Sequence, residues 1–181
     1  SLDILHRFGK VFDGTYTRFN DLLRSEAQAR EAEIELALER VRARTMAMQH
    51  SDELSAASLL LDQQVRALGI KTRGCAFNIY GKDESTEWFS SEAGTIPSYK
   101  TPREKIFKKY YQLGLSGTAL HIEEFDDKAC AKHYDYLETI PIMGDDIRHL
   151  KKIGAVPARQ IDHIAYFKYG YLLFVTLEAV A

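Results

Sequence analysis

The sequence is poor in cysteine and proline and has no long apolar run. Of its 181 residues only two are cysteines, Cys75 and Cys130, and four are prolines. Two cysteines cannot build a disulfide framework, and such scarcity is typical of a reducing compartment. The longest apolar runs, such as 171–175, are far shorter than the roughly 20 residues that cross a bilayer. We therefore expect a cytoplasmic protein without membrane contact.

The chain also lacks a strong charge of either sign. Its formal net charge is -2, with 45% hydrophobic and 28% charged residues. Such a balance predicts no general attraction to nucleic acid and leaves enough apolar material for a core. Residues 1–10 show no signal-peptide pattern. Because the sequence does not begin with Met, we expect a piece of a longer protein whose neighbouring domains are partners.

Motifs for catalysis or metal binding are missing as well. The sequence has no phosphate-binding glycine loop, no H-E-x-x-H and no G-x-S-x-G. Cys130 and His133 lie one helical turn apart, but two ligands are too few for a structural metal. A haem ligand from His121, His133, His149 or His163 stays open, although a lone His is more often structural. We expect no catalytic residue and no metal site, and leave the cofactor unknown.

The first 50 residues are dominated by helical patterns. Residues 5–23 place apolar side chains on one helical face, and residues 25–49 contain neither Gly nor Pro. In the second stretch the apolar positions repeat with a period near 3.5, which is typical of a coiled coil. This spacing predicts a homodimer through the N-terminal helix, with a seam made of Ala27, Ile34, Leu38, Val41, Thr45 and Met48.

Residues 51–181 show the mixed pattern of a globular domain. Ser51 is expected to cap a helix that ends at Gly69, and two hairpins are expected over residues 73–91 and 161–178. A loop is expected over 93–101, a helix from Pro102, a short strand over 119–123 and a helix over 126–139. Residues 144–153 are expected to be a helix or a loop. The fold class is therefore α+β: a long coiled-coil helix (1–50) followed by an antiparallel sheet with helices on its faces (51–181).

Two stretches of the N-terminal part resemble a known linker. The linker that precedes GAF domains in bacterial sensor histidine kinases is similar to residues 33–54, EIELALERVRARTMAMQHSDEL. Residues 7–22, RFGKVFDGTYTRFNDL, resemble the junction between two such domains. From Leu54 onward the order of expected elements is similar to a GAF fold. The resemblance implies two-component signal transduction, parallel dimerisation and a small-molecule pocket between the sheet and the middle segment, but it indicates no particular ligand.

The aromatic side chains are the candidates for such a pocket. Pockets are largely apolar with a few polar groups, and tyrosine supplies both. Eight aromatics fall in segments that would surround it: Trp88, Phe89, Phe107, Tyr110, Tyr111, Tyr134, Tyr166 and Tyr171. As ligand-pocket residues we select Trp88, Phe107, Tyr111, Tyr134 and Tyr166. The alternative is that most of these aromatics fill the core.

Three functions follow from these patterns. The first is a non-catalytic sensory and dimerisation module that relays ligand binding through the coiled coil. The second is a structural connector that has no ligand and sets the spacing of neighbouring domains. The third follows from the resemblance, because some GAF-like proteins reduce methionine sulfoxide with cysteine thiolates. Cys75 or Cys130 would then be the nucleophile, although Cys75 lies in an apolar strand and is typical of a core residue.

Overall fold

The computed structural model describes residues 2–180, which divide into two compact units between Arg40 and Val41. This division falls earlier in the chain than the domain boundary expected at residue 50. Within residues 2–180, no helix combines the length and the hydropathy that crossing a bilayer requires.

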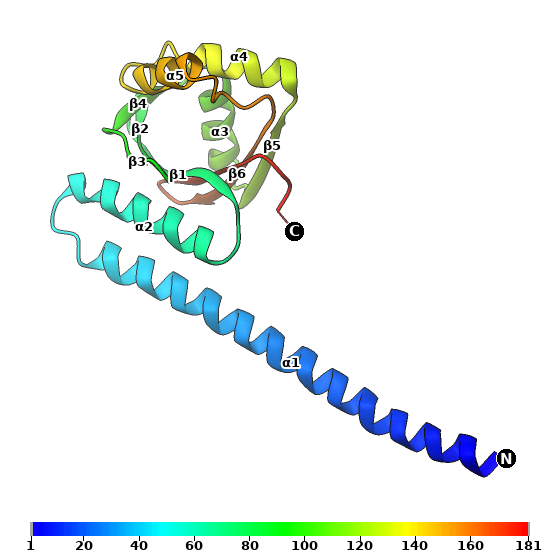
Figure 1. The fold of residues 1–181 in the computed structure, drawn as a ribbon. Coiled ribbons are helices and arrows are strands. Elements are labelled where there is room, and N and C mark those ends of the chain that lie inside the picture. Colours follow the sequence, from blue (N-terminus) through cyan, green and yellow to red (C-terminus); the bar gives the residue numbers. More distant parts are fainter. Residues whose placement is uncertain (1, 181) are drawn as a thin grey trace. The chain divides into compact units, whose positions relative to one another are not determined.

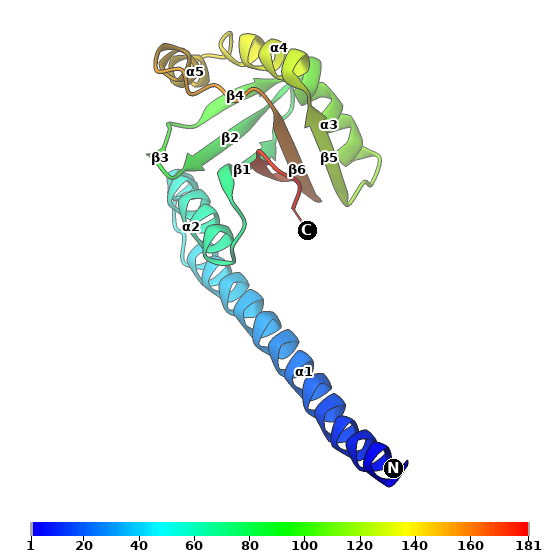
Figure 2. The ribbon, with the colours of Figure 1, turned by 45° about the vertical axis from the view of Figure 1, so that its right-hand side comes forward.

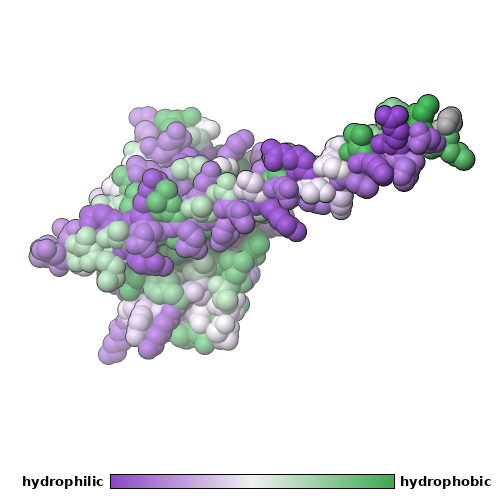
Figure 3. All heavy atoms as spheres, turned by 90° about the horizontal axis from the view of Figure 1, so that it is seen from below, coloured by the Kyte–Doolittle hydropathy of each residue, from purple (hydrophilic) through white to green (hydrophobic). Residues whose placement is uncertain are grey.

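The first unit is the greater part of a single helix, α1, which runs from Leu2 to Met46 without a break at Gly9 or Gly14. Its N-terminal apolar side chains remain exposed, with Phe8 at 60% and Phe12 at 66% of their full accessibility. Figure 3 shows these hydrophobic groups, in green, among hydrophilic ones at the N-terminal end of α1. Exposed apolar side chains at helical spacing are typical of a helix that packs on a partner.

The expected seam residues differ in exposure along α1. Ala27 and Leu38 are exposed, whereas Ile34, Val41 and Thr45 are half-buried. The Thr45 hydroxyl donates to the carbonyl oxygen of Val41 at 3.1 Å, so its polar group is satisfied within the helix. Met48 is half-buried but lies beyond the end of α1. The helix therefore supplies five of the six expected positions.

A short linker joins α1 to the globular part of the second unit. It contains a 3₁₀ turn, η1 (Ser51–Glu53), and leads into α2 (Leu54–Ala67). Glu53 Oε1 accepts hydrogen bonds from the backbone N–H groups of Gln49 and His50, at 2.9 and 3.1 Å. Its Oε2 lies 3.0 Å from Arg44 Nη1 at the end of α1. One carboxylate thus ties the end of α1 to the start of α2.

The expected helix cap at Ser51 is wrong, whereas the expected stop at Gly69 is confirmed. His50 is the N-cap of the 3₁₀ turn η1 and Glu53 is the N-cap of α2. The Glu53 carboxylate reaches back over the turn and accepts from the backbone N–H groups of Gln49 and His50. At the other end, Gly69 has φ +89°, the left-handed conformation that favours glycine just after a helix.

Within the described residues, seven antiparallel strands form one sheet in the order β3-β2-β1-β7-β6-β5, and β4 also pairs with β2. The central strands are β1 (Thr72–Tyr80), β7 (Gly170–Thr176) and β6 (Gln160–Phe167), and β5 (Leu120–Phe125) forms one edge. Beyond β2 (Glu84–Ser91) lie β3 (Gly94–Thr95) and β4 (Tyr99–Pro102). Both expected hairpins, β1–β2 and β6–β7, are confirmed. The loop expected over 93–101 is wrong, because two short strands there pair with β2.

Helices cover both faces of the sheet, which confirms the α+β fold class. Helices α3 (Lys105–Leu115), α4 (Asp127–Leu137) and α5 (Met143–Lys152) lie on one face, and α2 lies on the other (Figures 1 and 2). Pro102 ends β4 rather than opening α3, which begins three residues later. The main core lies between the sheet and α3, α4 and α5, and includes Tyr99, Phe107, Tyr134 and Ile147.

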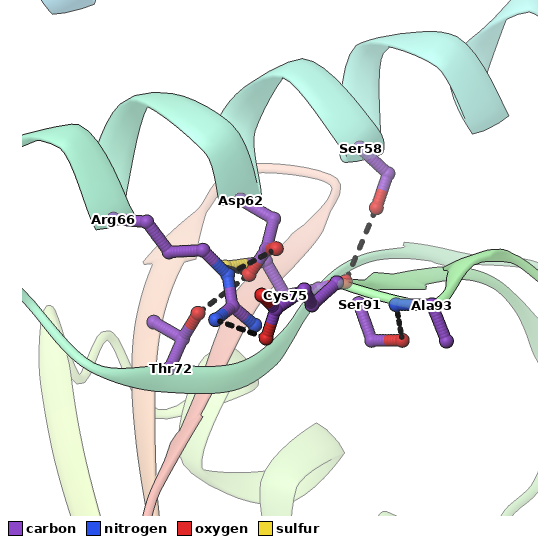
Figure 4. Close-up of polar contacts among 8 residues, drawn as sticks. Ser58, Asp62, Arg66, Thr72, Cys75, Ser91 and Ala93 are labelled. Carbon is purple, nitrogen blue, oxygen red and sulfur yellow. Dashed lines mark hydrogen bonds and ion pairs between the residues drawn. The ribbon is translucent and has the colours of Figure 1, made fainter.

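Buried polar contacts hold α2 against β1 and β2 (Figure 4). The Ser58 hydroxyl lies 3.1 Å from the carbonyl oxygens of both Cys75 and Trp88. Asp62 is 1% exposed, and its Oδ1 accepts from the Thr72 hydroxyl at 2.5 Å. Its Oδ2 pairs with Arg66 Nε at 2.7 Å. Because a buried carboxylate needs such partners, these contacts fix α2 in one position on the sheet.

Candidate ligand cavity

A cavity of about 240 Å³ lies between the sheet and the three helices that cover one of its faces, α3, α4 and α5. Strands β1, β2, β4, β6 and β7 all contribute lining residues to its sheet side. Its volume is slightly below the roughly 300 Å³ at which typical ligand pockets begin. The cavity therefore suits a small molecule of one or two rings rather than a large cofactor.

Aromatic rings make up much of the wall. Two of the five residues selected from the sequence, Phe107 of α3 and Tyr134 of α4, line the cavity. Phe89, Tyr99 and Tyr110 line it too. Tyr99 and Tyr110 are each 1% exposed, so these aromatics belong both to the core and to the cavity wall.

The other three selected aromatics do not line the cavity. Trp88 follows Glu87 on β2, and successive strand residues point to opposite faces, so Trp88 lies on the face that α2 covers. Tyr111 follows Tyr110 on α3 and packs edge-on against Tyr80, with the Arg103 guanidinium 3.8 Å from its ring centroid. Tyr166 packs against Tyr171, beyond the end of the cavity.

Glu87 is a buried acid in the cavity wall that no sequence motif indicates. It lies on β2, is 2% exposed, and accepts from the Tyr99 hydroxyl at 2.5 Å and from Asn78 Nδ2 at 2.7 Å. Asn78 Nδ2 also lies 3.1 Å from Thr101 Oγ1. Burial raises the pKa of Glu87, and the hydrogen bonds from Tyr99, Asn78 and Tyr171 oppose that rise.

Asp162 is a second buried acid in the same wall. It lies on β6, is 2% exposed, and accepts from the Tyr110 hydroxyl at 2.8 Å and from Gln160 Nε2 at 2.7 Å. The Tyr134 hydroxyl in turn donates to Gln160 Oε1 at 2.7 Å. Burial raises the pKa of Asp162 to about 7, although its hydrogen bonds act in the opposite direction. Its protonation therefore changes near neutral pH.

A β-bulge brings Arg73 to the cavity. The pairing of β1 with β7 shifts between Thr72 and Gly74, which leaves Arg73 as an extra residue on β1. Thr72 and Cys75 face α2, whereas Arg73 lines the cavity on the opposite face and donates to the Ala155 carbonyl oxygen at 3.0 Å. Bulges commonly re-aim one side chain at a functional site in this way.

Gly74, the residue just after the bulge, makes room for the ring of Phe89. A β-carbon at residue 74 would lie 2.2 Å from the ring of Phe89 and 2.7 Å from the carbonyl oxygen of Ser90. Only glycine leaves room for this ring beside the strand. Gly74 therefore shapes the cavity wall without touching the cavity itself.

The four histidines considered as haem ligands lie on four different elements. His133 of α4 and His149 of α5 line the cavity, whereas His121 and His163 lie on β5 and β6. His133 stacks on Phe125 at a centroid distance of 4.5 Å, and burial lowers its pKa to about 4, so it is neutral at pH 7. Among residues 2–180, no group of three His, Cys, Asp or Glu side chains is arranged to hold a metal ion.

Both cysteines are buried, and neither has the surroundings of a reactive thiol. Burial, with the Asp62 carboxylate 3.4 Å from its sulfur, raises the pKa of Cys75. Burial also raises the pKa of Cys130, whose thiol donates to the Pro157 carbonyl oxygen at 3.3 Å. Reactive cysteines need a lowered pKa and access to solvent. Neither thiol meets these conditions.

Comparison of the chain with family models, with curated proteins and with solved structures gives no match.

Proposed function

We propose that the chain is a non-catalytic sensory and dimerisation module of a bacterial signal-transduction protein, most simply a GAF-like domain of a cytoplasmic sensor histidine kinase. A small molecule binds in the cavity, and its binding is relayed to neighbouring domains through a coiled coil formed by α1. The observation that carries the proposal is the cavity, which combines aromatic walls with buried polar groups. Such a combination is typical of a ligand site.

The contacts of α2 provide a route from the cavity to α1. Strands β1 and β2 line the cavity on one face, and on the other their backbone carbonyls accept from Ser58 of α2. Helix α2 follows η1, where Glu53 pairs with Arg44 at the end of α1. A ligand that prefers one arrangement of β1 and β2 would thereby favour one position of the end of α1.

The exposed apolar side chains of α1 support dimerisation. Phe8, Phe12 and Leu38 are each more than half exposed, which is costly for a helix that stays alone in water. Pairing two copies along the seam would cover Leu38, whereas Phe8 and Phe12 belong to the separate apolar stripe of residues 5–23. The high pKa of both thiols, in turn, supports a role without cysteine catalysis.

Sedimentation velocity tests the dimer. We expect the parent chain to sediment as a dimer and Leu38→Glu to sediment as a monomer, because a seam position would carry a charge. The matched control is Ala29→Glu, which places the same charge at an exposed position of α1 outside the seam and should remain dimeric. A parent chain that stays monomeric at high concentration would contradict the proposed relay.

Native mass spectrometry tests the ligand. We expect the purified chain to retain a small molecule, and Leu150→Trp to lose it, because Leu150 is a half-buried residue of the cavity wall and the larger ring would fill the space. Circular dichroism checks that the variant is folded.

A parent chain that binds nothing, even when small molecules are added, favours the structural connector. Methionine sulfoxide turnover that is lost in a Cys75→Ser, Cys130→Ser variant would favour the enzyme.

A further inference from the structure

The charges in the cavity wall are unbalanced. Among the described lining residues, Glu87, Asp146 and Asp162 are acids, whereas Arg73 is the sole Lys or Arg. Its guanidinium donates to the Ala155 carbonyl oxygen at 3.0 Å, and among the described residues it forms no ion pair with Glu87 or Asp162. The formal charge of the wall is therefore negative whenever these acids are ionised.

The two buried acids are held by neutral groups alone. Hydroxyl and amide donors contact Glu87 and Asp162, and no Lys, Arg or His within residues 2–180 pairs with either of them. An ionised carboxylate accepts about four hydrogen bonds. Asp162 accepts two, from Tyr110 and Gln160, and Glu87 accepts from Tyr99 and Asn78 with a further hydrogen bond from Tyr171. Each acid thus retains unused acceptor capacity at the cavity. Buried carboxylates are normally paired with a cation or with several donors.

The remaining wall suits the body of an organic cation. Phe89, Tyr99, Phe107, Tyr110 and Tyr134 supply ring faces and edges, and Leu173 and Val175 supply apolar surface from the sheet. Aromatic faces attract cations within about 6 Å, and they also pack against rings and alkyl chains. The cavity of about 240 Å³ limits the guest to a small molecule.

We propose that the ligand is a small organic cation, namely an amine, amidine or guanidine attached to an apolar or aromatic body. Its head donates hydrogen bonds to the carboxylates of Asp162 and Glu87, and its body packs among the aromatic rings. The inference rests on the proposed function, in which the cavity holds a ligand. It disfavours phosphates and carboxylates, because these anions would face two buried acids of the same charge.

Isosteric probes of different charge test the class of ligand. We would titrate the full chain at pH 8 with 2-phenylethylamine, 2-phenylethanol and phenylacetate, and with benzamidine, benzamide and benzoate. Binding is followed by NMR shifts of residues in the cavity wall. The cation of each set is expected to bind at least tenfold more tightly than its neutral isostere, and the anion to bind most weakly.

Substitutions of the two acids identify the groups that recognise the cation. Asp162→Asn and Glu87→Gln should each reduce cation affinity about tenfold while the affinity for the neutral isostere stays within threefold. Glu84→Gln is the matched control, because Glu84 is an exposed acid on the same strand as Glu87 and lies outside this cavity. It should leave both affinities unchanged.

The outcomes separate this inference from the proposed function. If neutral or anionic probes bind the cavity as tightly as the cations, the ligand is not a cation, but the cavity remains a ligand site. If cations bind equally well to the parent and to both acid variants, recognition by Asp162 and Glu87 is refuted. If no probe of any charge shifts the cavity residues, the proposed function itself fails.

Discussion

Replacing Asp162 with Asn should change how the stability of the fold depends on pH. The substitution keeps the shape of the side chain but removes its charge. An amide at residue 162 can keep both contacts if the Gln160 amide turns over, because the Tyr134 hydroxyl can either donate or accept. The main difference is that the parent carboxyl must ionise while buried.

The size of the effect follows from the pKa of Asp162. A pKa of about 7 in the fold, against an ordinary value of 3.8, means that the folded state binds more protons than the unfolded state between these values. The parent chain therefore loses stability as pH rises, by about 1.4 kcal/mol per pH unit from this group, until pH passes 7. The full penalty above pH 7 is roughly 4 kcal/mol as an upper bound.

Urea unfolding of the parent and of Asp162→Asn at pH 5, 6, 7 and 8 measures the effect. We expect the stability of the variant relative to the parent to rise by roughly 2.5 kcal/mol between pH 5 and pH 8. The other charged groups near Asp162 are present in both proteins, so their contributions largely cancel in the difference: Arg73, Glu87, Glu123, His133, Asp146 and His149. If the two stability curves run parallel with pH, Asp162 does not titrate near neutrality and this reasoning is wrong.

Three further predictions concern the elements that build the cavity and connect it to α1. Gly74→Ala should destabilise the fold by about 1–3 kcal/mol in urea unfolding, because its methyl group must displace the Phe89 ring; an unchanged midpoint would contradict this. Asp62→Ala should lower the stability of the fold by about 2–4 kcal/mol, since it removes the carboxylate that the Thr72 hydroxyl and Arg66 contact. Thermal unfolding measures this change, and a loss of stability below about 1 kcal/mol would count against this role of Asp62. Hydrogen bonds from the backbone of residues 49 and 50 and from Arg44 lower the pKa of Glu53. The parent should therefore lose the stability that Glu53 contributes as pH falls below about 4.5. In acid titrations, Glu53→Gln should lack this contribution to the loss.

The sequence predicts those parts of the fold that depend on local signals. Gly69 marks the end of α2 because a left-handed residue is needed there. The β6–β7 hairpin is evident from two apolar strands, which the structure joins through Lys168 and Tyr169. The strands β3 and β4 have two and four residues, and they form because β2 offers an edge for pairing. Strand β3 follows β2 after a connection of residues 92–93, but strands this short carry no alternating apolar pattern by which they could be predicted.

The cavity is predictable only in part, because its members come from strands and helices far apart in the chain. Aromatic content indicates Phe107 and Tyr134, but the face on which each residue lies depends on the register of its element, and this excludes Trp88. The two acids were missed although they carry a signal. Asp162 is an acid within an expected strand, and its alternate neighbours Gln160 and Ile164 are both buried. A charged residue on the inner face of a strand is a candidate for function.

Crystals of the chain soaked with the charged and neutral probes would test the central claim most directly, which is that the cavity beneath α3, α4 and α5 receives a small molecule. We predict that electron density for a probe appears in the cavity, in contact with Phe89 and Leu173, with the head of the cationic probes at Asp162 or Glu87. Density for every probe at other surfaces alone, with the cavity closed by its own side chains, would contradict the account.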